Sequence, residues 1–147
     1  MTSKDRKEVI KHSSAIQVSN KVNLLQRRTW NILLANAFNE LDTKEIFQIN
    51  ITDLCKTLKY ESRNDKHLKK LLRELMDIKI EWNLLNKDKK KEWGAMVLLA
   101  EVKIINGVLF YAYPPSLRKS LHNPNVYAKI NLKLQNKTKN KPRRQLG

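Results

Sequence analysis

The chain has 147 residues, of which 41% are hydrophobic, so a single domain that buries a core of its own is expected. Thirty Lys and Arg residues against fourteen Asp and Glu residues give a formal net charge of +16, which favours polyanionic partners such as nucleic acid. The apolar runs fall far short of the roughly 20 residues of a membrane span, and the single cysteine excludes an intrachain disulfide framework. We therefore expect a cytoplasmic location and no membrane partner.

The first third of the chain predicts a flexible end, a helix and a short strand. Residues 1–12 are mostly polar and form the expected flexible N-terminus. Residues 47–51 alternate between apolar and polar side chains and predict a strand. Between them, apolar residues at helical spacing predict a helix over 24–41; they are Trp30, Leu33, Leu34, Ala37, Phe38 and Leu41.

A helix-turn-helix is predicted next. Thr52 begins a short helix that reaches Leu58, residues 59–63 form a turn, and a second helix runs over 64–77. The second helix has an apolar face and a basic face, because residues three or four positions apart share one side of a helix. The apolar face consists of Leu68, Leu71, Leu72 and Leu75. The basic face consists of Lys66, Lys69, Lys70 and Arg73.

The pattern after the second helix is that of strands. Residues 78–84 alternate and predict a half-buried strand, and residues 87–92 form a charged loop. Six consecutive apolar residues begin a strand over 95–105, which we expect to be covered on both faces. Asn106-Gly107 is a strong hairpin signal, and residues 108–113 form the expected returning strand.

The C-terminal part predicts a short helix from Pro115 to Leu121, a strand over 127–134 and a basic tail without apolar periodicity. The expected organisation is a flexible N-terminus (1–12), one winged-helix domain (13–134) and a basic disordered tail (135–147). The expected fold class is α+β, a winged helix-turn-helix domain with an antiparallel β-hairpin wing.

Enzymatic chemistry finds no support in the sequence. The three histidines, His12, His67 and His122, have no metal-ligand spacing, and Cys55 has no nearby partner of the kind that a zinc site uses. The three glycines do not cluster into a phosphate loop. We expect no catalytic residues, no metal and no cofactor.

The basic helix has two interpretations. A charged stripe opposite leucines can simply be the solvated face of an amphipathic helix, but its place after a short helix and before a hairpin favours contact with double-stranded DNA. The charged loop would then serve as the wing tip, and Trp93 beside it is open to either packing or base contact. The predicted DNA-binding residues are Lys59, Arg63, Lys66, Lys69, Lys70, Arg73, Lys89, Lys90 and Lys91.

The apolar strand 95–105 favours a different partner. A strand that is apolar on both faces near a sheet edge is an aggregation risk unless something covers it, which indicates a symmetric dimer. The alternative is that the helix 24–41 and the strand 127–134 cover it within one chain. The predicted dimer-interface residues are Val97, Leu99, Val102 and Ile104.

Several segments resemble a known family. Residues 10–20 and 24–34 resemble the opening of plasmid replication initiators of the iteron-binding Rep-3 type, and 47–54, 66–76 and the hairpin up to Pro114 continue the resemblance over roughly residues 9–135. Such initiators have two winged-helix domains; they bind repeated origin sites as monomers and repress their own promoter as dimers. The resemblance implies that this chain is the first domain, which would supply a dimer interface and some contact to the DNA backbone. The chain stops after the lead-in to the second domain, so we expect that domain to be absent.

The sequence therefore predicts a non-enzymatic DNA-binding module of a plasmid replication initiator, with an implied role in origin (iteron) binding, replication initiation and autorepression. The alternative is a dimerisation or protein-interaction module derived from a truncated initiator, which would form a homodimer or a mixed dimer with the full-length protein and whose basic surface would be incidental.

Overall fold

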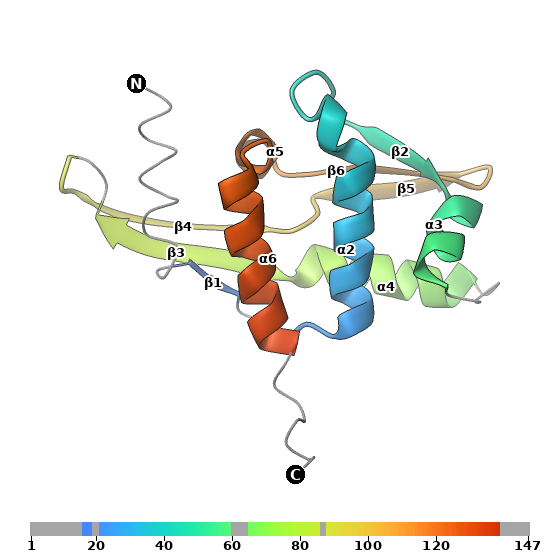
Figure 1. Cartoon of the computed structure of the whole chain (residues 1–147), viewed down its shortest axis with the longest axis horizontal. Coiled ribbons are helices and arrows are strands. Elements are labelled where there is room, and N and C mark those ends of the chain that lie inside the picture. The colour runs from blue at the N-terminus through green and yellow to red at the C-terminus, as the bar shows by residue number, and fades with distance from the viewer. Residues whose placement is uncertain (1–15, 19–20, 60–64, 86–87, 139–147) are drawn as a thin grey trace, which may run out of the picture.

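The computed structural model describes residues 16–18, 21–59, 65–85 and 88–138 (Figure 1). The helices within these residues are α2 (Leu24–Ala37), continued by the 3-10 turn η2 (Phe38–Glu40), α3 (Ile51–Leu58), α4 (Asp65–Asp77), α5 (Pro115–Leu121) and α6 (Pro124–Thr138). The strands are β1 (Ile16–Val18), β2 (Phe47–Asn50), β3 (Lys79–Leu85), β4 (Lys91–Val97), β5 (Glu101–Ile105) and β6 (Val108–Ala112).

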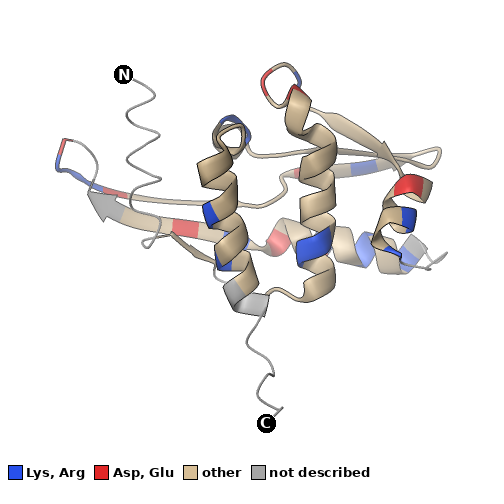
Figure 2. Cartoon of the chain, in the orientation of Figure 1, with Lys and Arg blue, Asp and Glu red and all other residues tan. Residues whose placement is uncertain are grey.

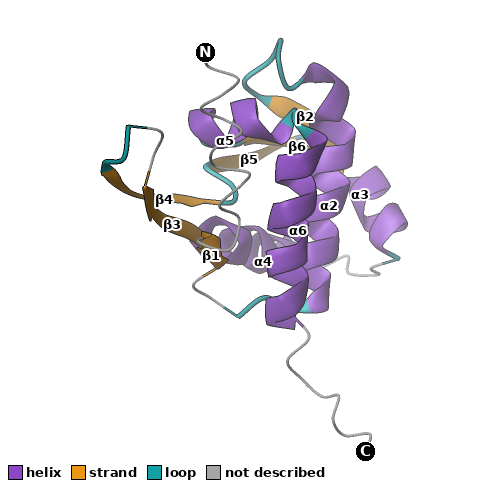
Figure 3. Cartoon of the chain, turned by 60° about the vertical axis from the view of Figure 1, so that its left-hand side comes forward, coloured by secondary structure: helices purple, strands orange, loops and turns teal. Residues whose placement is uncertain are grey.

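The strands form two antiparallel sheets around a helical centre. One sheet has the order β1-β3-β4 and the other the order β2-β6-β5. Helix α2 lies beside α6 and also contacts α3 and α4, and α4 crosses behind α2 (Figures 1 and 3). The succession α2, β2, α3, α4 and a later β-hairpin that pairs with β2 is that of a winged helix-turn-helix, so the predicted fold class is confirmed.

Helix α2 supplies the centre of the core. It begins where the sequence provides a capping box: the Asn23 side chain accepts a hydrogen bond from the Gln26 backbone N–H (2.7 Å), and the Gln26 side chain accepts one from the Asn23 N–H (3.0 Å). The indole of Trp30 is fully buried and donates to the backbone oxygen of Leu98 (3.2 Å), so its polar group is paired within the core. Trp30 is one of the residues whose spacing predicts this helix, and the face that these residues share is the one that packs in the core.

The prediction of one strand over 95–105 is wrong. The chain leaves the first sheet at Val97 and enters the second at Glu101. At the crossover, the Leu98 N–H bonds to the Ile78 oxygen (3.0 Å) and the Ala100 N–H to the Ala112 oxygen (2.8 Å). The apolar run is explained by this crossover, since its middle residues fill the core between the two sheets rather than lying on two faces of one strand.

The prediction of a strand over 127–134 is also wrong, because these residues belong to helix α6. Pro124 stands in the first turn, where a missing backbone N–H costs nothing, and the Asn123 side chain accepts from the Asn125 N–H (2.9 Å). The buried residues Val126, Ile130 and Leu134 recur every four positions, as one face of a helix requires. The helix continues four residues beyond the expected end of the strand, to Thr138.

Candidate nucleic-acid interface

Helix α4 presents the two faces that the sequence predicts. Its four leucines are buried in the core, while its basic residues are exposed and recur along the length of the helix (Figure 2). The exposed basic residues, named here the α4 basic face, are Lys66, Lys69, Lys70 and Arg73. The amphipathic character of this helix is confirmed, and its charge is available at the surface.

The basic residues differ in how they are engaged. Lys70 forms a salt bridge with Glu74 one turn later (2.8 Å), and Glu74 also accepts from the Gln26 side chain (2.9 Å). These two hydrogen bonds lower the pKa of Glu74, so the carboxylate stays charged and holds Lys70. Within the described part of the chain, Lys69 and Arg73 form no salt bridge, and they carry the positive charge that a polyanion can neutralise.

The turn before α4 begins at Lys59, which has a left-handed backbone (φ 57°) and caps α3 with its N–H on the Lys56 oxygen (3.1 Å). Arg28 of α2 donates to the last carbonyl of α3, that of Leu58 (3.4 Å). The side chain of Lys59 is exposed at the C-terminal end of α3, where the turn begins. Arg63, the other cation predicted here, lies outside the described residues.

The hairpin that flanks α4 is β5–β6. Its two-residue turn has positive φ at both Asn106 (49°) and Gly107 (76°), as the hairpin signal predicts. The Ile51 N–H bonds to the Gly107 oxygen (2.9 Å) and ties this turn to the first residue of α3. The helix-turn-helix and the hairpin are thus joined directly.

The predicted wing tip belongs to the other hairpin. Lys89 and Lys90 lie in the connection between β3 and β4, and Lys91 begins β4. Strand β3 carries this tip about 23 Å beyond the C-terminal end of α4, at roughly 3.3 Å per residue, and the β5–β6 turn lies at the opposite end of the molecule (Figure 1). The structure does not bring Lys89, Lys90 and Lys91 together with the α4 basic face.

Beside this tip, two tryptophans are held by carboxylates on opposite faces of the β3–β4 hairpin. The Trp93 indole donates to Glu81 (2.8 Å) on the outer face, where Trp93 is 63% exposed. The Trp82 indole donates to Glu92 (2.9 Å), and its ring lies so close to Gly94 that a Cβ there would overlap it. Trp82 is partly buried against the core, and Trp93 is a surface residue.

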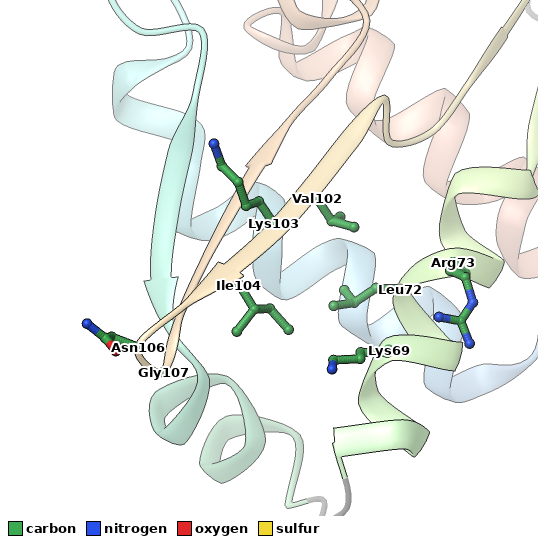
Figure 4. Close-up of a pocket in the computed structure, with 8 residues that line it drawn as sticks. All are labelled: Lys69, Leu72, Arg73, Val102, Lys103, Ile104, Asn106 and Gly107. Atoms are coloured by element: carbon green, nitrogen blue, oxygen red, sulfur yellow. The ribbon is translucent and has the colours of Figure 1, made fainter.

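An open groove with a volume of about 510 Å³ separates α4 from the β5–β6 hairpin (Figure 4). It brings together residues that the sequence assigns to different roles: Lys69 and Arg73, predicted to bind DNA, and Val102 and Ile104, predicted to form a dimer seam. The complete lining consists of Lys69, Leu72, Arg73, Val102, Lys103, Ile104, Asn106 and Gly107.

The predicted dimer-interface residues lie in three different places. Leu99 is 0% exposed and packs in the core of its own chain, so its assignment to an intermolecular seam is wrong for this structure. Val97 is half-buried at the end of β4. Val102 and Ile104 are half-buried in the groove. The chain crosses between sheets at 98–100, which separates Val97 from the other two.

Sequence reasoning missed three groove residues, namely Lys103, Asn106 and Gly107. The hairpin signal located the turn, but its position beside α4 depends on the pairing of β2 with β6, which are far apart in the sequence. Among the described residues, no group of three or more His, Cys, Asp or Glu side chains is placed to hold a metal ion. The same residues also include no helix with the length and apolarity needed to cross a membrane.

Comparison with known proteins agrees with this geometry. Residues 8–142 match the family described as "Initiator Replication protein, WH1". The fold is similar to the WH1 domain of MSBI1.176, a replication protein isolated from a multiple sclerosis patient, with a TM-score of 0.55 and 7% sequence identity over 93% of this chain and 96% of that chain. It is also similar to domains 2 and 3 of RctB, with a TM-score of 0.51 and 7% identity over 86% of this chain and 59% of that chain.

Comparison with curated protein sequences finds no match. At 7% identity the two solved structures establish the fold alone, whereas the family match spans most of the chain. The chain belongs to the initiator replication protein family, and its fold is that of the WH1 domain.

Proposed function

We propose that this chain is a DNA-binding module of a plasmid replication initiator, acting in the cytoplasm by binding rather than by catalysis. The observation that carries the proposal is the α4 basic face, which is exposed on the second helix of a helix-turn-helix whose leucines are buried. In such motifs the second helix approaches the DNA while neighbouring elements contact the phosphate backbone. Membership of the initiator family agrees with this role.

Within this site we assign unequal roles to the predicted cations. Lys69 and Arg73 are the main phosphate contacts, and Lys66 is a further predicted contact on the same face of α4. Lys70 contributes less, because its ammonium group is shared with Glu74. Lys59 and Arg63 remain predicted contacts at the turn.

The basic tip of Lys89, Lys90 and Lys91 is a separate prediction. Because β3 carries it about 23 Å from the end of α4, it would meet a different stretch of the DNA backbone or none. We assign the wing instead to the β5–β6 hairpin, whose turn lies beside α4.

The test is binding to two fluorescently labelled duplexes, one with origin-type repeats and one of random sequence, at two salt concentrations. Phosphate contacts carry no sequence information, so we expect both duplexes to bind and the repeat duplex to bind only modestly better. Affinity should fall steeply as salt rises. Absence of duplex binding at low salt, or an affinity that does not respond to salt, would refute the proposal. Origin recognition, initiation and autorepression are the roles that the family resemblance implies for such binding.

Dimerisation is the second candidate, and the observation that favours it is an edge strand. β4 is the last strand of the β1-β3-β4 sheet and presents the exposed Trp93 and the half-buried Val97. A second copy or a full-length initiator could pair with such an edge. Sedimentation at high micromolar concentration tests this candidate, and a purely monomeric chain would contradict self-association.

A further inference from the structure

The groove beside α4 is bordered by a second sheet edge, that of β5. In the β2-β6-β5 sheet, β5 is the outer strand, and it faces α4 across the groove (Figure 4). The two-residue turn makes Ile105 and Val108 the closing hydrogen-bonded pair. Since hydrogen-bonded and non-hydrogen-bonded pairs alternate along an antiparallel ladder, Lys103 bonds to β6 while Val102 and Ile104 direct their N–H and C=O groups outward.

The neighbouring strand confirms this alternation. The Ile51 N–H bonds to the Gly107 oxygen. Every second residue of β6 counted from Gly107, including Leu109, therefore forms its backbone hydrogen bonds with β2, and the residues between them form theirs with β5. Among the described residues, none outside the sheet bonds to the backbone of Val102 or Ile104. The edge therefore offers two donors and two acceptors in the register of a strand.

The side chains that line the groove add apolar and basic contacts beside the edge strand β5. Val102, Ile104 and Leu72 form an apolar floor, and Lys69 and Arg73 stand on the helical wall (Figure 4). The lining includes three cations and no acidic residue. The volume of about 510 Å³ lies within the range of roughly 300–1,000 Å³ that is common for ligand sites.

We propose that this groove binds an extended acidic segment of a partner protein, which adds to β5 as a further strand. The segment's backbone would pair with Val102 and Ile104, as in other cases of strand addition. Its alternate side chains would be apolar toward the floor and acidic toward Lys69 and Arg73, which favour carboxylates. A nucleic-acid backbone fits less well, because phosphodiesters lack hydrogen-bond donors for the outward carbonyl groups and leave the apolar floor uncovered.

Binding of such a segment would compete with DNA, a consequence that rests on the proposed DNA-binding function. Lys69 and Arg73 belong both to this groove and to the α4 basic face. An acidic segment in the groove would neutralise two of the cations that DNA requires, so peptide and duplex would compete. Binding of the peptide itself requires no DNA, so the two ideas fail separately.

The probe is a labelled synthetic heptapeptide of alternating glutamate and valine, titrated into the full chain without DNA and followed by fluorescence anisotropy. The control peptide replaces every glutamate by lysine. We expect the acidic peptide to bind and the basic one not to bind. Absence of binding up to about 1 mM acidic peptide, or equal binding of both peptides, overturns the proposal.

Charge reversal locates the site. The double change Lys69→Glu and Arg73→Glu should weaken the acidic peptide at least about tenfold, because it replaces attraction by repulsion. The matched control is Lys119→Glu with Lys129→Glu, which changes the net charge equally on α5 and α6, outside the groove. Equal losses in the two variants would attribute binding to net charge alone and overturn the proposal.

Hydrogen exchange tests the strand addition itself without any mutation. The peptide should slow amide exchange at Val102 and Ile104, whose N–H groups point outward, and change that of Lys103 much less. A short DNA duplex is titrated in parallel. If the duplex protects these two amides and the peptide does not, the groove is part of a nucleic-acid site and the proposal is wrong.

Discussion

Replacing Leu99 by Ala distinguishes a residue of the monomer core from a residue of a dimer seam. Leu99 is completely buried within its own chain, beside Leu98, whose backbone oxygen accepts the Trp30 indole. Truncating a fully buried leucine costs about 2–5 kcal/mol in lost transfer energy and cavity formation. At about 2–4 °C per kcal/mol for a chain of this size, a central cost of about 3 kcal/mol lowers Tm by about 6–12 °C.

The assay is urea unfolding followed by circular dichroism, with a thermal melt of the same samples. The matched control is Leu132→Ala, the same substitution at a side chain that is 55% exposed, where the expected change is within about 0.5 kcal/mol. If Leu99→Ala costs no more than the control, or if its only effect is to convert a dimer into a stable monomer, then the core assignment of Leu99 is refuted.

Three further changes test the local physics of the fold. Gly94→Ala should destabilise the chain by about 1–3 kcal/mol in urea unfolding, because the new Cβ overlaps the ring of Trp82; an unchanged midpoint would mean that the ring does not lie on Gly94. Asn23→Ala removes the capping box of α2 and should cost about 1 kcal/mol, whereas a Gly substitution there should cost less. The pKa of Glu74 is lowered by its hydrogen bonds, the first from Lys70, so its contribution to stability is present above its ordinary pKa of 4.5 and is lost as pH falls through the lowered value. Glu74→Gln should therefore flatten the acid limb of the stability–pH curve, and an identical limb in the variant would contradict this pairing.

The helices before residue 78 could be predicted because each satisfies only one periodicity. The α6 segment satisfies two: Ile130 and Leu134 fit both an alternating pattern and a repeat of four. The repeat of four is completed by the buried Val126, whereas alternation would require Leu132 to be buried, and it is exposed. Alternation alone could not decide between strand and helix, and the proline in the first turn of α6 was the signal that favoured the helix.

The groove could not be predicted for a different reason. An apolar run such as that around Leu98 and Leu99 shows that residues are buried, but it does not show which elements cover them. The position of Val102 and Ile104 beside α4 depends on the pairing of β2 with β6 across more than 50 residues, and no local pattern encodes that pairing. The sequence therefore identified the exposed cations of α4. It also predicted that the β3–β4 tip would act as the wing, whereas the hairpin beside α4 in the structure is β5–β6.

The salt dependence of a triple variant tests whether the α4 basic face binds duplex DNA. Each phosphate contact contributes about −0.9 to the slope of log K against log salt concentration. Changing Lys66, Lys69 and Arg73 together to Ala removes three contacts, so the slope should become shallower by about 2.7. Folding should be nearly unaffected, because exposed helical charges contribute only tenths of a kcal/mol each.

The control changes Lys44, Lys119 and Lys129 to Ala, which removes the same charge from the 41–46 loop, α5 and α6. Duplex affinity is measured at several salt concentrations for the unmodified chain and for both variants, and log K is plotted against log salt concentration. If the α4 basic face binds the duplex, the slope becomes shallower by about 2.7 in the α4 variant and stays nearly unchanged in the control. A slope that the α4 variant leaves unchanged, or that the control reduces as much, would contradict this binding.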